Sequence, residues 1–268
     1  MQRLFAALFI CLVFSGVVAA AERAVDLELV LAADVSGSMD PGEAALQRQG
    51  FVNALRHPEV IKAIKGGMLG RIAVTYVEWA GAYYQRSLVG WTEIADAATA
   101  NAFADAVARP EVKTERYTSI STLINTSAAR FASNGFEGTR RVIDISGDGP
   151  NNRGEYVHLA RDRAVAGSIV INGLPIINDR PSPGGYPSMA NLDLYYEDCV
   201  IGGPGAFLVV ANGFEDFARA ILRKMILEIA GWTPPLERLY FAAAKPRPAC
   251  DAGERQLEKW RPPAFFDY

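Results

Sequence analysis

The segment Val25-Asp-Leu-Glu-Leu-Val-Leu-Ala-Ala-Asp-Val-Ser-Gly-Ser38 joins an apolar run to a polar turn. Residues 25–32 begin with alternation and become fully apolar, which is typical of a strand that enters a covered sheet. Just beyond the turn, Asp40 is a helix cap, Pro41 suits the first helical position and Glu43 lies three residues past the cap. The segment therefore predicts a strand, a polar turn and a helix in direct succession.

The same alternation of strand and helix patterns continues along the chain. Short apolar runs predict strands at residues 71–77, 142–145, 168–171 and 206–210, with a hairpin partner at 83–89. Helical spacing of apolar residues predicts helices at residues 97–107, 120–131, 155–166 and 214–229. This order predicts an α/β fold with three layers, a mostly parallel central sheet and helices on both faces. Such folds place their functional site at the carboxyl ends of the strands.

The two ends of the chain differ from its body. Residues 1–21 have a positive Arg3, an apolar run and a final Ala-Ala-Ala, the pattern of a secretory signal peptide. A retained membrane anchor is the alternative, although the apolar run is marginal for a span of ~20 residues. We expect cleavage, a periplasmic or secreted location, and no stable membrane span afterwards. Residues 25–231 are then the folded domain, and residues 232–268, with six of the 15 prolines, an irregular Pro-rich tail.

Two cysteines, Cys199 and Cys250, remain after the predicted signal peptide. In an oxidising compartment they predict a disulfide that closes a loop of about 50 residues. Two buried free thiols are the open alternative. Residues 178–188 are rich in Pro and Gly and predict a surface loop, either a recognition loop or a plain connector.

Charge and residue usage exclude several functions. The formal net charge of −3 leaves no basic excess to bind a nucleic acid. No Gly-rich loop ends in Gly-Lys-Ser or Gly-Lys-Thr, so no nucleotide site is expected. The only histidines, His57 and His158, lie in no recognisable catalytic motif, which speaks against a serine hydrolase. We therefore do not expect an enzyme.

Oxygen-bearing side chains follow the predicted strands. Asp34, Ser36 and Ser38 follow the first strand, Asp148 follows the strand at 142–145, and Thr118 precedes a predicted helix. With no histidine or thiol nearby, such ligands favour a hard divalent cation, Mg²⁺ by default, with Ca²⁺ or Mn²⁺ possible. The alternative is that these residues only form turns and helix caps, which Asp, Ser and Thr favour without any metal.

The order Asp34-x-Ser36-x-Ser38, then Thr118, then Asp148-Gly resembles the metal-ion-dependent adhesion site of von Willebrand factor type A domains. Residues 144–152 also resemble a group of uncharacterised secreted bacterial proteins built on this domain. The resemblance covers about residues 25–230. It implies that Ser36 and Ser38 ligate the metal directly, and that Thr118 does so directly or through water. In the family, the residues at the positions of Asp34 and Asp148 often act through water.

By the same resemblance, the domain binds a protein ligand whose Asp or Glu fills the open sixth position of the metal. This predicts a cation-dependent recognition domain of the cell envelope. A permanent accessory subunit with a structural metal and a metal-assisted hydrolase are the alternatives. The sequence departs from the family pattern at Tyr117, where many members carry glycine, and at Gly147, where Thr or Ser is common. Ser119 and Ser121 are alternatives to Thr118 as the third-loop ligand.

Overall fold

The computed structural model describes residues 22–178, 180, 182–183, 185–232 and 246–260. The predicted signal peptide, residues 1–21, lies outside the described residues, as do two stretches of the predicted tail. The domain boundaries therefore remain predictions. Within the described ranges, no helix has the length and apolar character needed to cross a membrane.

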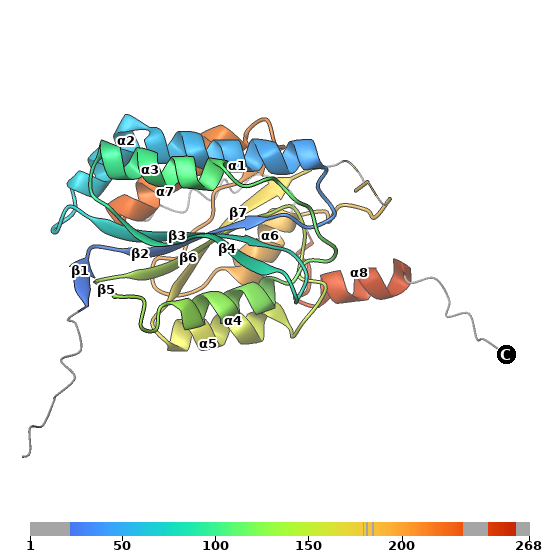
Figure 1. Ribbon diagram of the computed structural model, residues 1–268. Helices are drawn as coiled ribbons and strands as arrows, with labels where there is room; N and C mark the ends of the chain where they lie inside the picture. The colour runs from blue at the N-terminus through green and yellow to red at the C-terminus, as the bar shows by residue number, and fades with distance from the viewer. Residues whose placement is uncertain (1–21, 179, 181, 184, 233–245, 261–268) are drawn as a thin grey trace, which may run out of the picture.

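A six-stranded sheet runs through the middle of the molecule in the order β4-β3-β2-β6-β7-β8 (Figure 1). The central strand β2 is buried at all seven positions because sheet and helices cover it on every side. The strands of this sheet are β2 (Glu28–Asp34), β3 (Ile72–Trp79), β4 (Gln85–Ile94), β6 (Arg141–Gly147), β7 (Val170–Ile177) and β8 (Ala211–Asn212). All neighbours are parallel except β3 and β4, which form the expected antiparallel hairpin. A small parallel pair joins β1 (Arg23–Val25) to β5 (Phe136–Gly138).

Helices cover both faces of the sheet, so the predicted three-layer α/β fold is confirmed (Figure 1). On one face lie α1 (Pro41–Arg56), α2 (Pro58–Lys65), α3 (Ala97–Ala108) and α7 (Phe217–Ala230). On the other lie α4 (Ile120–Arg130), α5 (Val157–Ala166), α6 (Leu192–Tyr195) and a π-helix (Tyr196–Val200). Each face has its own cluster of buried apolar side chains, because each strand points alternate residues to opposite sides.

The start of α1 follows the sequence pattern closely. The Asp40 side chain accepts a hydrogen bond from the Glu43 N–H at 2.9 Å, and the Glu43 carboxylate accepts from the Asp40 N–H at 3.0 Å. This capping box fixes where the helix begins and so where the preceding polar turn ends. Helix α2 was not predicted. It is short, and it begins at Pro58 with His57 as its cap, accepting the Glu59 N–H at 3.2 Å.

The strand predicted at residues 206–210 is not formed as a continuous strand. Leu208 makes only an isolated bridge to Gly173, and β8 begins later, at Ala211. The ladder is interrupted because the Asn172 side chain, rather than a strand carbonyl, accepts the Phe207 N–H at 2.9 Å.

The predicted disulfide is present, and it joins Cys199 to Cys250 with their Cα atoms 5.4 Å apart. The described part of the tail is not wholly irregular, since residues Ala252–Trp260 form α8. Its start is held against the domain by the disulfide, which gives a short helix the support that isolated helices of this length lack.

Candidate functional site

Two aspartates lie at the carboxyl ends of the two central strands. Asp34 is the last residue of β2, and Asp148 directly follows β6. Asp34 is fully buried, and its Oδ1 accepts the Ser36 N–H at 2.7 Å, which folds the turn back over the end of the strand. The parallel pairing of β2 with β6 therefore brings together two carboxylates that lie 114 residues apart in the chain.

Hydroxyl groups connect these two turns. The Ser36 and Ser38 Oγ atoms lie 3.0 Å apart, and Ser38 Oγ donates to Asp148 Oδ1 at 2.5 Å. Four of the five predicted ligands, including Asp34, thus share one continuous polar cluster.

Thr118 approaches the same cluster from the loop before α4. Its N–H donates to the Asn152 Oδ1 at 2.9 Å, and its carbonyl accepts from the Asn152 N–H at 2.8 Å. A Cβ placed on Gly149 would lie 3.9 Å from Thr118 Oγ1, so the threonine hydroxyl faces the turn that follows Asp148. The structure therefore brings together the three loops predicted from the sequence.

The two alternative serines are engaged elsewhere. Ser119 caps α4, and its Oγ donates to the Arg153 carbonyl at 2.9 Å. Ser121 Oγ donates to the same carbonyl at 3.4 Å, which leaves Thr118 as the hydroxyl with the better position.

Sequence reasoning missed three polar residues that hold the cluster in place. The Gln47 amide donates to the Asp34 carbonyl at 2.6 Å and accepts from Ser146 Oγ at 2.9 Å, so α1 is tied to both strands. Asn151 Oδ1 accepts the Ser121 N–H at 2.9 Å, and Asn152 holds Thr118. The two adjacent asparagines after Gly-Pro were the available signal, since Asn side chains commonly bond backbone groups in turns.

Asp34 and Asp148 are buried, and in the described part of the chain no positively charged side chain pairs with either of them. Burial, and then the negative charge of Asp148, raises the pKa of Asp34 well above its usual range. Burial raises the pKa of Asp148 to about 6. Asp34 Oδ2 accepts no hydrogen bond from the described residues. Because burying an uncompensated carboxylate is costly, this arrangement fits a bound cation.

Among the described residues, no three His, Cys, Asp or Glu side chains gather into a metal-binding group. The candidate site differs from such groups because only two of its five side chains are acidic. Two carboxylates balance a divalent cation, and oxygen ligands alone suit Mg²⁺, which also retains several waters.

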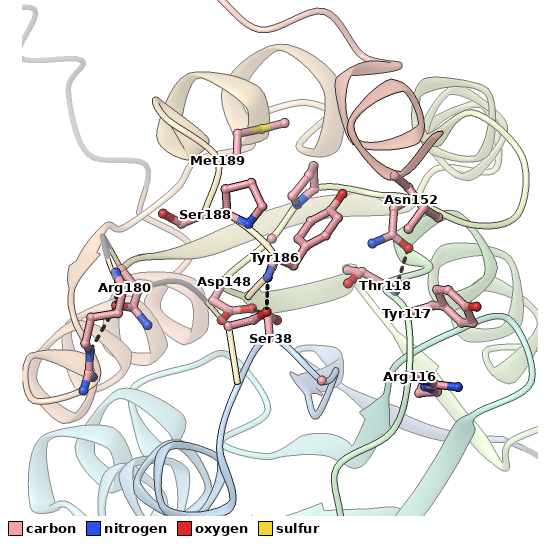
Figure 2. A pocket seen from close by; sticks show the side chains of 17 residues that line it. Ser38, Arg116, Tyr117, Thr118, Asp148, Asn152, Arg180, Tyr186, Ser188 and Met189 are labelled. Atoms are coloured by element: carbon pink, nitrogen blue, oxygen red, sulfur yellow. Dashed lines mark hydrogen bonds between the residues drawn. The ribbon is translucent and has the colours of Figure 1, made fainter. Parts of the chain in front are cut away.

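A cavity of about 280 Å³ opens beside this cluster (Figure 2). Its polar end includes Ser38, Thr118 and Asp148. The other walls come from several loops and from α8, and they carry both charged and apolar side chains; Arg116, Arg180, Tyr186, Met189 and Leu257 are among them. The loop at residues 178–188, of which 179, 181 and 184 are not described, therefore borders the candidate site.

The two departures from the family pattern have structural reasons. Tyr117 has a φ of +68°, a left-handed conformation that glycine adopts without strain, and its ring lies 4.3 Å from the Arg153 guanidinium carbon. At Gly147, a Cβ would lie 2.8 Å from Asp34 Oδ2 and 2.9 Å from the Tyr196 hydroxyl. Thr or Ser has no room there because Asp34 and Tyr196 fill that space.

This crowding gives a first prediction. Gly147→Ala is expected to lower the free energy of unfolding by about 1–3 kcal/mol, because Asp34 and Tyr196 must move to admit the methyl group. Urea unfolding measures the change. Gly90→Ala on β4 is the matched control, since a Cβ there meets nothing within 4 Å, and we expect a change within about 0.5 kcal/mol. Equal stability of the two variants would contradict the prediction.

The sheet order and the two helical layers are those of the von Willebrand factor type A fold, and solved structures share this fold. Proximal thread matrix protein 1 from the mussel byssus matches with a TM-score of 0.56 and 12% identity, over 79% of this chain and 50% of that one. The pilus adhesin SpaC from Lactobacillus rhamnosus GG matches with a TM-score of 0.54 and 13% identity, over 78% and 31%. A von Willebrand factor type A structure from Catenulispora acidiphila matches with a TM-score of 0.50 and 15% identity, over 78% and 43%.

The chain belongs to the family described as "Protein of unknown function (DUF1194)", whose model matches residues 24–233. No curated protein matches the sequence. The chain spans half or less of the solved structures named above. The mussel protein has also been solved with a "zinc occupied MIDAS motif"; that structure matches with a TM-score of 0.51 and 11% identity, over 78% and 49%.

Proposed function

We propose that this protein is a divalent-cation-dependent protein-binding domain of the cell envelope. The observation that carries the proposal is the pair of buried carboxylates, Asp34 and Asp148, joined to hydroxyls at the polar end of an open cavity. Ser36, Ser38 and Thr118 would ligate the cation, and the two aspartates would hold its waters. The cation would supply an electrophilic centre for an acidic side chain of a protein partner.

The chemistry of the cluster supports this role. Hydroxyl ligands are neutral, so they do not reduce the positive charge of a divalent cation, which then attracts a further anionic ligand. Mg²⁺ binds six ligands, so one coordination position suits the carboxylate of a partner's Asp or Glu. The cavity gives such a side chain access from solvent. Two proteins of similar fold, a pilus adhesin and a thread matrix protein with a zinc-occupied MIDAS motif, support a binding role for this fold.

Two features support the envelope location. Residues 1–21 carry the predicted signal peptide, and the Cys199–Cys250 disulfide is typical of proteins that mature in an oxidising compartment.

Calorimetric titration of Mg²⁺, Mn²⁺ and Ca²⁺ into the purified protein tests the cation site. We expect saturable binding of at least one cation, and a loss of affinity of at least about 100-fold in Asp34→Ala, because one of only two carboxylates at the site is removed. Ser38→Ala, at a partly exposed position, is expected to weaken binding with an unchanged circular dichroism spectrum.

Asp105→Ala is the matched control, since Asp105 is an exposed acid on α3 that pairs with Arg56. Its affinity should equal that of the unchanged protein. The proposal fails if the unchanged protein binds none of the three cations, or if Asp34→Ala and Ser38→Ala both bind as tightly as the control.

A further inference from the structure

Two arginines line the cavity beside the candidate cation site, on opposite sides of Ser38 and Asp148 (Figure 2). Arg180 is already neutralised, because its guanidinium donates to Glu43 Oε1 of α1 at 2.7 Å. Arg116 is exposed, and in the described part of the chain no carboxylate forms an ion pair with it. The uncompensated positive charge in the cavity wall therefore lies on one side of the candidate site.

Backbone contacts hold the loop that carries Arg116 in one position. The Glu115 N–H donates to the Val35 carbonyl at 2.8 Å, and the Gly81 N–H donates to the Arg116 carbonyl at 3.1 Å. A Cβ on Gly81 would lie 2.6 Å from that carbonyl oxygen, so only glycine lets the turn between β3 and β4 approach the loop so closely. The loop is therefore attached both to the turn after β2 and to the turn between β3 and β4.

The residue after Arg116 has an unusual backbone conformation. Tyr117, with its left-handed φ of +68°, directly precedes the candidate ligand Thr118 and is 43% exposed. The Arg153 guanidinium lies over its ring, and among the described residues no carboxylate forms an ion pair with Arg153 either. Backbone strain of this kind clusters at functional sites. The loop thus presents an exposed aromatic ring and two guanidinium groups next to Thr118, and Tyr and Arg are the residues enriched at the centres of protein interfaces.

We propose that Arg116 is a specificity-determining residue, and that the partner presents two carboxylates, one to the cation and a second to the Arg116 guanidinium. This inference rests on the cation site of the proposed function, and it defines the partner as an acidic segment rather than a single Asp or Glu. A guanidinium binds a carboxylate through two parallel hydrogen bonds, which makes it selective for that group. Because Glu43 already pairs with Arg180, the second carboxylate binds on the Arg116 side.

The spacing along this loop limits how far apart the two carboxylates of the partner lie. Arg116 is two residues from Thr118, and two residues of extended chain span at most about 7 Å. A partner segment that lies along the loop covers this distance with two or three of its own residues. The second acidic residue is therefore expected within three positions of the one that binds the cation.

Peptide titrations of the purified protein in the presence of Mg²⁺ test the proposal. The probes are end-blocked glycine peptides that carry one Asp, or that Asp and a second Asp placed one, two or three residues before or after it. The ¹⁵N shifts of the Gly37 and Gly149 amides measure affinity, and the Arg116 Nε–H signal reports contact with the second carboxylate. We expect the best two-Asp peptide to shift this signal and to bind about three- to fivefold more tightly than the one-Asp peptide, the gain typical of an exposed charge pair.

Arg116→Gln separates the role of Arg116 from that of the cation site. It should remove the advantage of the second Asp, while the affinities for Mg²⁺ and for the one-Asp peptide stay within about twofold of their original values. Arg116→Lys keeps the charge without the paired donors and should retain part of the advantage. Arg223→Gln is the matched control, because Arg223 is an exposed arginine of α7, and it should behave like the unchanged protein.

The possible failures are distinguishable. If Mg²⁺ shifts neither Gly37 nor Gly149, the proposed cation site itself fails. If Mg²⁺ shifts both glycines but the two-Asp peptides bind no better than the one-Asp peptide at any spacing, or if no peptide binds, the role of Arg116 is excluded and the cation site stands. An advantage of the second Asp that persists in Arg116→Gln would also overturn the inference, because another cation would then hold the second carboxylate.

Discussion

Lys224→Met is expected to lower the free energy of unfolding by about 3–5 kcal/mol. Lys224 lies on α7 and is fully buried against the central sheet. Its ammonium group lies 2.5 Å from Asp144 Oδ1 on β6 and 3.1 Å from Glu228 Oε2 one turn further along α7. Glu228 in turn accepts from the Asn172 amide of β7 at 2.8 Å. The lysine is thus the cation of a polar cluster that joins α7 to two central strands.

Removing this cation leaves two buried carboxylates facing each other. Burial already raises the pKa of Asp144 well above its usual range, and Lys224 is the group that opposes this rise. Without Lys224, the buried carboxyl of Asp144 must be protonated in the folded protein, whereas in the unfolded chain it is ionised at neutral pH. This difference in protonation costs stability at neutral pH. The difference in free energy of unfolding between Lys224→Met and the unchanged protein should therefore shrink as pH falls from 7 toward 5. A carboxyl whose pKa is raised in the folded state binds its proton more tightly there than in the unfolded chain, so acid favours the folded variant.

Urea unfolding at several pH values measures both effects. Lys62→Met is the matched control, because Lys62 is 78% exposed and pairs only weakly with Glu59 at 3.6 Å, so a change within about 0.5 kcal/mol is expected. Adding Asp144→Leu to Lys224→Met should recover part of the loss, since it removes one unpaired buried charge. A loss below about 1 kcal/mol in Lys224→Met would contradict the assigned role of the cluster.

Local sequence patterns were sufficient to predict the alternation of strands and helices. Buried parallel strands are apolar on both faces, so runs such as residues 29–33 stand out from the amphipathic helices around them. They also predicted which polar residues meet, because Asp34 and Asp148 each follow a strand and parallel strands end at the same edge. Whether these residues bind a cation stays a prediction.

Interactions between distant side chains were not predictable in this way. Lys224 and Glu228 follow the helical pattern of a solvated face, yet both are buried, because their partner Asp144 lies 80 residues earlier in the chain. The interrupted strand at 206–210 has the same origin, since the bond that interrupts it comes from the Asn172 side chain. Periodicity describes which face of an element is apolar, but not which polar groups meet across the fold.

Replacing Cys199 and Cys250 together with alanine is expected to lower the free energy of unfolding by about 4 kcal/mol. The disulfide spans 51 residues, and closing a loop of that length restricts the unfolded chain by about this amount in the chain-entropy model. The loop contains α7, which packs against α1 and the central sheet, so the restricted segment includes part of the hydrophobic core. The loss should therefore appear in global unfolding and not only at α8.

Urea unfolding of the double variant against the oxidised protein measures the global effect, and amide exchange of α8 measures the local one. Reduction of the unchanged protein should reproduce most of the loss, whereas the double variant should not respond to reductant. The exchange of α8 should accelerate more than that of α7, because α8 is attached mainly through the disulfide and the polar contacts of Glu254 and Gln256. A faster α8 with unchanged global stability would contradict the prediction, because it would place the whole effect of the disulfide in the folded state rather than in the unfolded chain.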